Sequence, residues 1–284
     1  MNLKQYFNWD ALKAAAPELC RDCGSADEAV GNCASLEELF TLWSAAQACE
    51  LGAMENADNA RYSTFPDLKK YHGSCALADR SYGGNPALRK AMLGHFCRDG
   101  FVEEGTGKAD TALFVFRESN ISDDVTLDGG QIALNQAEKF WLEEQWDKKG
   151  SDSDNKDPYV TFMEQHMKWA EADVGHMSIR RIAVMNLNKR GGFGTCRYAR
   201  LRHYAEVYRP FIQREIAIIN PKIIFCGGTF GTVKNLLPNE LANRVEVWDC
   251  YHPSAWKQQE ADQIKNGYFK VQHNNHISEC RRVL

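Results

Sequence analysis

Three short polar runs, each following a stretch of apolar residues, carry the side chains that could do chemistry. They are Arg117-Glu118-Ser119-Asn120, Asn186-Leu187-Asn188 and Tyr251-His252-Pro253-Ser254. A carboxylate can stabilise a cation and can orient or deprotonate water. An amide offers a donor and an acceptor, and a histidine can donate to an oxygen that gains negative charge. Brought together at one place, a carboxylate, an amide and a histidine would form a plausible active site.

The apolar stretches before these runs are expected to be strands that position them. Residues 111–116, 182–185 and 245–248 are short and apolar, and residues 221–228 form a further strand that ends in glycines. Runs of this kind are typical of strands buried on both faces of a parallel sheet. Ligands of an open parallel sheet bind outside the carboxyl ends of the strands. We therefore expect the three polar runs to meet at one edge of a sheet.

Helical patterns alternate with these strands, which favours an α/β layer fold with right-handed crossovers. Apolar spacing predicts helices over 36–46, 86–93, 132–145, 159–172, 198–219 and 229–237. Ser35 and Glu38 form the pattern of a capping box, and Pro210 is expected to kink the long helix. Residues 1–107 are expected to be a mostly helical N-terminal extension, and residues 108–284 the α/β core.

Composition and charge restrict the class of protein. The chain has 284 residues, 44% of them hydrophobic and 25% charged, which is ordinary for a globular protein. Its net charge of −4 counts against a generally basic nucleic-acid binder, although a local basic face can still contact phosphates. Lys189 and Arg190 begin a basic cluster that continues through Arg197, Arg200 and Arg202. The alternative for this cluster is a solvated loop and helix face.

The sequence carries no membrane signal and no strong metal motif. No apolar run approaches the ~20 residues that span a bilayer, and the first residues lack the apolar stretch of a signal peptide, so we expect a cytoplasmic protein. Its ten cysteines are then expected to be free thiols. Cys20 and Cys23 form a CxxC that could supply half of a zinc or iron–sulfur site. Because there is no second CxxC, we expect no cofactor, and a metal at Cys20 and Cys23 stays the alternative.

The order of the motifs from near Asp110 to the C-terminus resembles the uracil-DNA glycosylase superfamily. Members have a first strand that ends in a catalytic acid or amide and a second that ends in an Asn. A segment like Asn220–Gly228 then precedes a short helix, and a last strand leads to a His-Pro-Ser loop. The resemblance implies a three-layer α/β/α core around a mostly parallel, four-stranded sheet.

The resemblance also implies roles for the matched residues. Glu118 matches the water-activating residue, Asn186 the amide that reads the base, and His252 the histidine that stabilises the departing base. Ser254, with the backbone around Pro253, matches a loop that holds a phosphate. The target base must leave the duplex stack and enter a pocket, for which Phe116 and Tyr251 are expected walls. The expected DNA contacts are Arg117, Ser119, Lys189, Arg190 and Ser254.

Departures from the superfamily pattern point to an unusual base. Phe116 stands where the first motif usually has Gly, and Ser119 where it has Pro. The Gly191-Gly192-Phe193-Gly194 loop could give way to a bulky base. Some glycosylases that resemble this superfamily attack hypermodified phage DNA, so a damaged or modified base, uracil or a hypermodified cytosine, is the expected substrate, and antiviral defence the expected setting.

We therefore expect a DNA glycosylase that leaves an abasic site, acts as a monomer and uses no metal. Monofunctional action is favoured because no Lys stands at a motif position to form a Schiff base. Two alternatives remain open at this point. One is a catalytically silent DNA-binding or sensor protein of the same fold. The other is an α/β enzyme that cleaves small nucleosides or nucleotides.

Overall fold

The computed structural model describes residues 8–60, 95–103, 110–120, 125–128, 131–134, 159–160, 163, 166–167, 179–192, 198–242 and 244–250. The chain divides into two compact units, each made of several stretches. We call Met1–Arg98, Glu118–Glu138 and Leu187–Ile218 the helical unit, and Asp99–Arg117, Lys139–Asn186 and Ile219–Leu284 the sheet unit. The sequence predicts two consecutive parts that meet at residue 107, and that division stays a prediction.

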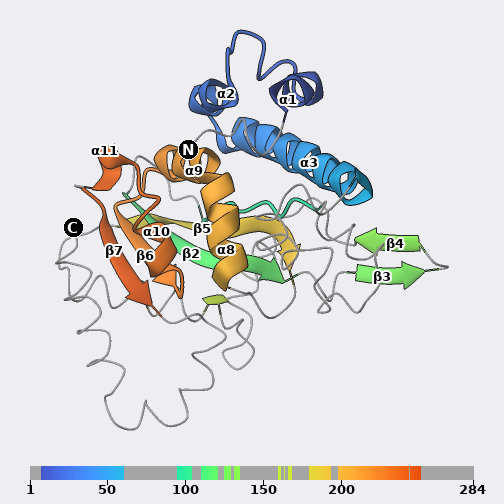
Figure 1. The fold of residues 1–284 in the computed structure, drawn as a ribbon. Helices are drawn as coiled ribbons and strands as arrows, with labels where there is room; N and C mark the ends of the chain where they lie inside the picture. The colour runs from blue at the N-terminus through green and yellow to red at the C-terminus, as the bar shows by residue number, and fades with distance from the viewer. Residues whose placement is uncertain are drawn as a thin grey trace. The chain divides into compact units, whose positions relative to one another are not determined.

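Helices dominate residues 8–60, where the sequence predicts the helix over 36–46. They are α1 (Trp9–Ala15), α2 (Ala26–Asn32) and the long α3 (Leu36–Ala60), drawn in blue in Figure 1. Two further helices, α8 (Tyr198–Val207) and α9 (Arg209–Ile219), follow β5 in the chain. The predicted helix over 86–93 lies outside the described residues.

The predicted capping box at the start of α3 is confirmed. The Ser35 hydroxyl accepts a hydrogen bond from the Glu38 backbone N–H at 3.2 Å, and the Glu38 carboxylate accepts one from the Ser35 N–H at 3.3 Å. The Glu38 carboxylate also accepts a hydrogen bond from the Ala34 backbone N–H at 2.6 Å. These bonds satisfy N–H groups that have no partner inside the helix, which fixes where α3 begins.

The long helix predicted over 198–219 is broken into α8 and α9. The turn is at Tyr208, two residues before Pro210, whose ring and missing N–H disfavour a continuous helix. The predicted buried face is present on both pieces, in Tyr204, Val207, Tyr208, Phe211, Ile212 and Ile216. Trp43 of α3 stacks on this face, with its ring centroid 5.2 Å from Phe211 and 5.9 Å from Tyr208.

The described strands build a five-stranded sheet in the order β1-β5-β2-β6-β7. Their bounds are Gly100–Glu103, Ile179–Gly192, Asp110–Asn120, Ile223–Gly227 and Glu246–Cys250, in that order. The pairs β2 with β6 and β6 with β7 are parallel, whereas β1 pairs with β5 antiparallel. The predicted count of four strands is wrong, because β1 was not anticipated. Strand β1 has only four residues, which is too short for an apolar pattern to predict a strand.

Two predicted strands are longer in the structure. The strand predicted over 111–116 extends to Asn120, and the strand predicted over 182–185 extends to Gly192. Glu118, Asn186 and Asn188 therefore lie within strands rather than in loops after them. Backbone pairing continued past the apolar stretch, and apolar pattern alone does not report such pairing.

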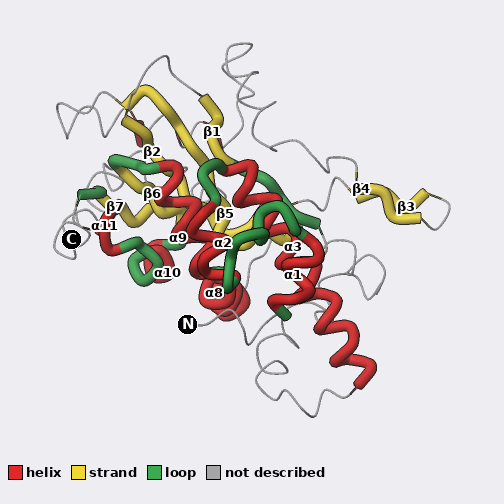
Figure 2. The backbone as a smooth tube through the Cα atoms, turned by 90° about the horizontal axis from the view of Figure 1, so that it is seen from above, coloured by secondary structure: helices red, strands yellow, loops and turns green. Residues whose placement is uncertain are grey.

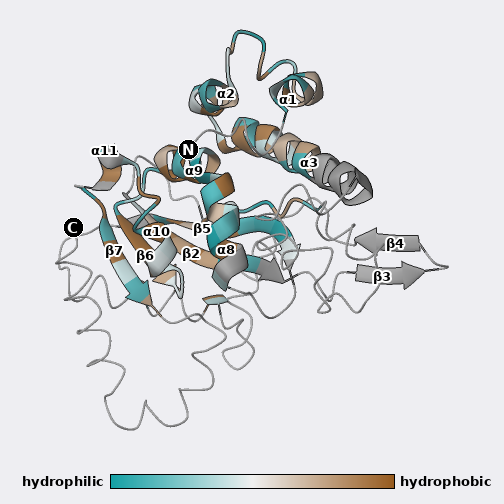
Figure 3. Ribbon diagram, viewed as in Figure 1, coloured by the Kyte–Doolittle hydropathy of each residue, from teal (hydrophilic) through white to brown (hydrophobic). Residues whose placement is uncertain are grey.

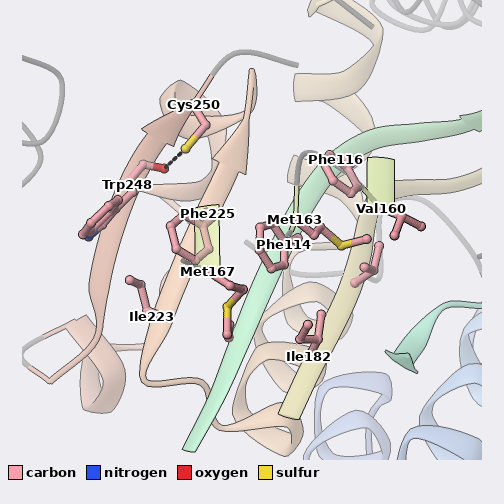
Figure 4. Close-up of a cluster of buried hydrophobic side chains, with 12 residues drawn as sticks. Phe114, Phe116, Val160, Met163, Met167, Ile182, Ile223, Phe225, Trp248 and Cys250 are labelled. Atoms are coloured by element: carbon pink, nitrogen blue, oxygen red, sulfur yellow. Dashed lines mark hydrogen bonds between the residues drawn. The ribbon is translucent and has the colours of Figure 1, made fainter. Parts of the chain in front are cut away.

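The core of the sheet unit lies between the sheet and residues 159–167, of which the described members are helical. Phe114 and Phe225 stack with ring centroids 4.7 Å apart, and Met163 and Met167 belong to the same buried cluster (Figure 4). Strand β6 is buried along its whole length, and Figure 3 shows it in the brown of hydrophobic residues. The helical state of these residues agrees with the helix predicted over 159–172.

The remaining elements are short. Strands β3 (Val125–Asp128) and β4 (Gln131–Leu134) pair antiparallel. The helix predicted over 132–145 is therefore wrong at residues 132–134, and its remainder lies outside the described residues. The helix predicted over 229–237 is reduced to α10 (Phe230–Val233), which lies beside β6 and β7 (Figure 2) and is followed by α11 (Asn239–Ala242). Among the described helices, none is long and apolar enough to cross a membrane.

Candidate active site

The helical unit brings together Glu118 of β2 and Asn188 of β5. The Asn188 Nδ2 atom donates a hydrogen bond of 2.9 Å to Glu118 Oε2. Asn188 is buried, with 3% of its surface exposed, whereas Glu118 is of intermediate exposure. The carboxylate is thus held from the protein side on a side chain that is only partly buried, which suits a group that orients or deprotonates a water molecule.

The orientation of the Asn188 amide follows from its second hydrogen bond. Its Oδ1 atom accepts from the backbone N–H of Arg190 at 3.0 Å. A backbone N–H can only donate, so the oxygen of the amide must face Arg190 and the NH₂ group must face Glu118. The amide therefore offers Glu118 a donor, which suits an ionised carboxylate because that form only accepts.

Lys189, predicted to contact DNA, is fully buried in the helical unit. Its Nζ lies 2.8 Å from Glu215 Oε1, and both side chains have 0% exposure. The ammonium also lies 5.2 Å from the ring centroid of Trp43 and 5.3 Å from that of Phe40. Because Glu215 already neutralises the charge of Lys189 inside the protein, this geometry does not favour a contact between Lys189 and a phosphate. The predicted DNA contact of Lys189 stays a prediction.

Arg190 is the second predicted DNA contact that the structure places inside. Its Nη2 atom lies 2.7 Å from Glu50 Oε2 of α3, and the Tyr208 hydroxyl donates to the same carboxylate. Burial lowers the pKa of Arg190 and is the largest single cause, but the Glu50 carboxylate, its hydrogen bond and the nearby Tyr208 and Tyr204 together outweigh it, so the guanidinium pKa lies above its ordinary value. Burial raises the pKa of Tyr208 well above its ordinary value, so its hydroxyl stays protonated. Arg190 thus anchors the end of β5 to α3.

In the sheet unit, Arg117 lies against the turn that ends β6. Its Nε atom donates a long hydrogen bond of 3.4 Å to the Gly228 carbonyl. Gly228 has a φ of 67°, and its N–H donates to the Cys250 carbonyl at 2.7 Å. A Cβ atom on Gly228 would lie 2.8 Å from Arg117 Nη2, so the glycine leaves the room that the guanidinium occupies. Arg117 is of intermediate exposure, which is compatible with its predicted contact to DNA.

Phe116 and Asn186, the predicted base-binding residues of the sheet unit, are both buried at 1% exposure. The Phe116 ring belongs to the apolar cluster and meets Tyr159 edge to face at 5.1 Å. The backbone N–H of Asn186 donates to the Asp99 carboxylate at 2.5 Å. Phe116 is therefore engaged in the core, and the roles predicted for both residues stay predictions.

The other predicted site residues lie outside what the structure describes. These are Tyr251, His252 and Ser254 after the end of β7, together with the side chain of Ser119 in β2. Their predicted roles in catalysis, base binding and phosphate binding therefore stay predictions. What the structure supplies for the third motif is strand β7, which ends at Cys250 directly before it.

Cys20 and Cys23, the only CxxC of the chain, are buried free thiols. Burial raises the pKa of Cys20, and burial also raises that of the nearby Cys33, to about 11. Thiols bind metals as thiolates, so raised pKa values disfavour binding. Among the described residues, no group of three or more His, Cys, Asp or Glu side chains is placed to hold a metal ion.

The prediction from the sequence gave Asn188 no role of its own. It also did not include the buried acids Glu50, Glu215 and Asp99. Glu215 gave a readable signal, because it stands on α9 four residues after the buried Phe211 and three after the buried Ile212, on the same face of the helix. The partnership of Glu50 with Arg190 spans 140 positions, so no local pattern reveals it. Asn188 was recognisable only as a second amide two residues after Asn186.

The chain matches no protein-family model, no curated protein and no solved structure. The relation to the uracil-DNA glycosylase superfamily therefore stays a resemblance carried by the motifs.

Proposed function

We propose that the protein is a monofunctional DNA glycosylase. It would hydrolyse the N-glycosidic bond of a flipped-out damaged or modified base and leave an abasic site. The observation that carries the proposal is the Glu118 carboxylate, of intermediate exposure and held by the Asn188 amide at 2.9 Å. A fixed carboxylate on a side chain that is only partly buried suits water activation beside a sugar cation.

The other groups of the proposed reaction come from the sequence. His252 would donate to the base as negative charge develops on it, and Asn186 would read the base edge. Arg117, Ser119 and Ser254 would contact phosphates, and Tyr251 would form part of the wall of the base pocket. We further propose the three-layer arrangement, the cytoplasmic location and the monomeric state that the sequence predicts. Uracil or a hypermodified cytosine of phage DNA is the proposed substrate.

Scission of DNA strands by alkali after incubation with the protein tests this proposal. The substrates are duplexes and single strands that carry uracil, and DNA from phages with modified cytosines. The proposal predicts alkali-labile breaks with the native protein and a loss of about 10²–10⁴-fold in rate for Glu118→Gln, the range expected for a general base. Glu240→Gln, which changes an exposed carboxylate on α11, is the matched control and should keep the native rate.

Each outcome of this assay has a defined meaning. Breaks that depend on Glu118 support the glycosylase, and the DNA that breaks identifies the base. Salt-dependent binding to DNA without breaks would replace the proposal by a silent binder. Equal rates for the native protein and Glu118→Gln would remove Glu118 from the reaction.

One observation favours a second candidate, an enzyme that cleaves nucleosides or nucleotides. Lys189 and Arg190, which were expected to form a basic face, are buried against carboxylates. Less basic surface is then available for phosphate contacts. Release of free base from nucleosides, with no effect of polymeric DNA as competitor, would establish this candidate instead.

A further inference from the structure

We propose that Asn188 is a positioning residue that fixes the catalytic carboxylate of Glu118. The proposal rests on the proposed function and names a residue whose part in it is new. Asn188 is buried at 3% exposure, so its part is to hold Glu118 rather than to touch a ligand itself. Its amide uses one end for Glu118 and the other for the backbone.

Glu118 needs such a partner because its side chain is long. A glutamate loses substantial rotamer freedom when it is held in one place, and a misplacement of 1 Å can cost about 10²-fold in rate. The 2.9 Å bond from Asn188 Nδ2 selects one placement of the carboxylate. Because the donor comes from a neighbouring strand rather than from a loop, its own position is well defined.

Asn188 is in turn held at a well-anchored part of β5. The next two residues, Lys189 and Arg190, form the buried ion pairs with Glu215 and Glu50. The Arg190 backbone N–H, which binds Asn188 Oδ1, belongs to the same residue whose guanidinium is anchored to α3. Turning the amide around would therefore break the hydrogen bond from the Arg190 N–H and present an oxygen instead of a donor to Glu118, which costs free energy.

The test compares the native protein with Asn188→Ala, Asn188→Asp and the control Asn235→Ala. Asn235 is an exposed amide of the sheet unit that bonds a backbone carbonyl at 3.2 Å. Single-turnover cleavage and the dissociation constant for DNA are measured for each protein. Removal of the donor in Asn188→Ala is expected to lower the rate by about 10²-fold with unchanged DNA affinity, and Asn235→Ala is expected to keep the native rate.

The Asn188→Asp variant separates positioning from a merely structural role. It keeps the shape of the side chain and the bond to the Arg190 N–H, but it places a second carboxylate beside Glu118. Like charges at this distance disfavour ionisation of both groups, so the acidic limb of the rate-against-pH profile should move to higher pH. A shifted limb therefore shows that the side chain at position 188 lies beside the carboxylate that ionises in the reaction, whereas a structural role without that contact would change stability and leave the limb unmoved. Urea unfolding midpoints establish that each variant is folded, and Asn188→Asp carries the test if Asn188→Ala does not fold.

The outcomes separate this proposal from the proposed function. Slow cleavage by Asn188→Ala together with a shifted acidic limb in Asn188→Asp supports positioning. Native rates in both variants, or an unshifted limb, overturn it while Glu118-dependent cleavage still stands. A weakened affinity for DNA with an unchanged rate would make Asn188 a binding residue and would also overturn it. No cleavage by the native protein on any substrate overturns both proposals.

Discussion

Gly228 has an unusual backbone conformation and packs against Arg117, a candidate DNA contact. Its φ of 67° lies in the left-handed region, and the space beside its Cα is filled by the Arg117 guanidinium. Both features require the absence of a side chain. The glycines that end β6 were readable in the sequence as a turn, but the close approach of Arg117, 111 positions earlier, was not.

Substitution of Gly228 by alanine is expected to lower the free energy of unfolding by about 1–2 kcal/mol, the cost of a left-handed conformation with a Cβ atom. Gly231→Ala is the control, because a Cβ there meets nothing within 4 Å and the residue lies in α10. That variant should be neutral or gain up to about 1 kcal/mol, since alanine is the better helix former. Urea denaturation measures both, and equal stability of Gly228→Ala and the native protein would contradict the expectation.

At the scale of elements, α3 and the end of β5 are joined by the buried pair of Glu50 and Arg190. The two side chains have 5% and 8% exposure, and Tyr208 adds a hydrogen bond to the same carboxylate. Removing two charges from water costs desolvation free energy. Their mutual attraction offsets this cost, but only when both partners of the pair are present. α3 is therefore a structural part of the helical unit.

Glu50→Gln tests this connection by removing one charge and leaving Arg190 buried. The expected loss is about 3–5 kcal/mol of unfolding free energy, as for other buried pairs that lose one partner. Glu37→Gln is the matched control on the same helix, because the Glu37–Arg98 pair is 71% and 40% exposed. An exposed pair contributes about 0–1 kcal/mol. Similar urea midpoints for the two variants would show that the buried pair does not anchor β5.

Local signals predicted the start of α3 and a kink at Pro210, because a capping box and a proline act within one or two turns, although the structure breaks the helix there instead of kinking it. The ends of strands β2 and β5 were predicted wrongly, because they do not depend on local signals. Whether Glu118 and Asn188 continue their strands depends on partners far along the chain. The hydrogen bond between them spans 70 positions, so their meeting could be inferred only from the rule that ligands bind at sheet edges.

At the scale of the whole molecule, pH should affect stability through His203. Burial lowers the pKa of this histidine below 6.5, although Glu50 and Glu206 oppose the shift. As pH falls, the unfolded chain takes up the proton first, so the native state loses stability below about pH 6.5. We expect the urea midpoint to fall between about pH 7.5 and pH 5.5, and His203→Gln to show a smaller fall. An equal fall in both proteins would assign the effect to other groups.

Most of the mixed α/β architecture was predictable from alternation of apolar strands and helices, including β6 and β7 and the buried face of α8 and α9. The antiparallel β1 was not, because its pairing with β5 is specified by the partner strand rather than by its own four residues. Lys189 and Arg190 illustrate the same limit at the candidate site. A cluster of basic residues in the sequence predicts a charged surface. Here Glu215 and Glu50, which are distant in the sequence, neutralise two of these residues inside the protein.

Release of free base from DNA is the measurement that tests the central claim most directly. The native protein and Glu118→Gln are incubated with uracil-containing DNA and with phage DNA that carries modified cytosines, and the small-molecule fraction is analysed by mass spectrometry. The account predicts one free base from the native protein, an equal amount of abasic sites in the polymer, and formation of both that is about 10²–10⁴-fold slower with Glu118→Gln. Intact DNA with no free base from any substrate, or equal release by both proteins, would contradict it.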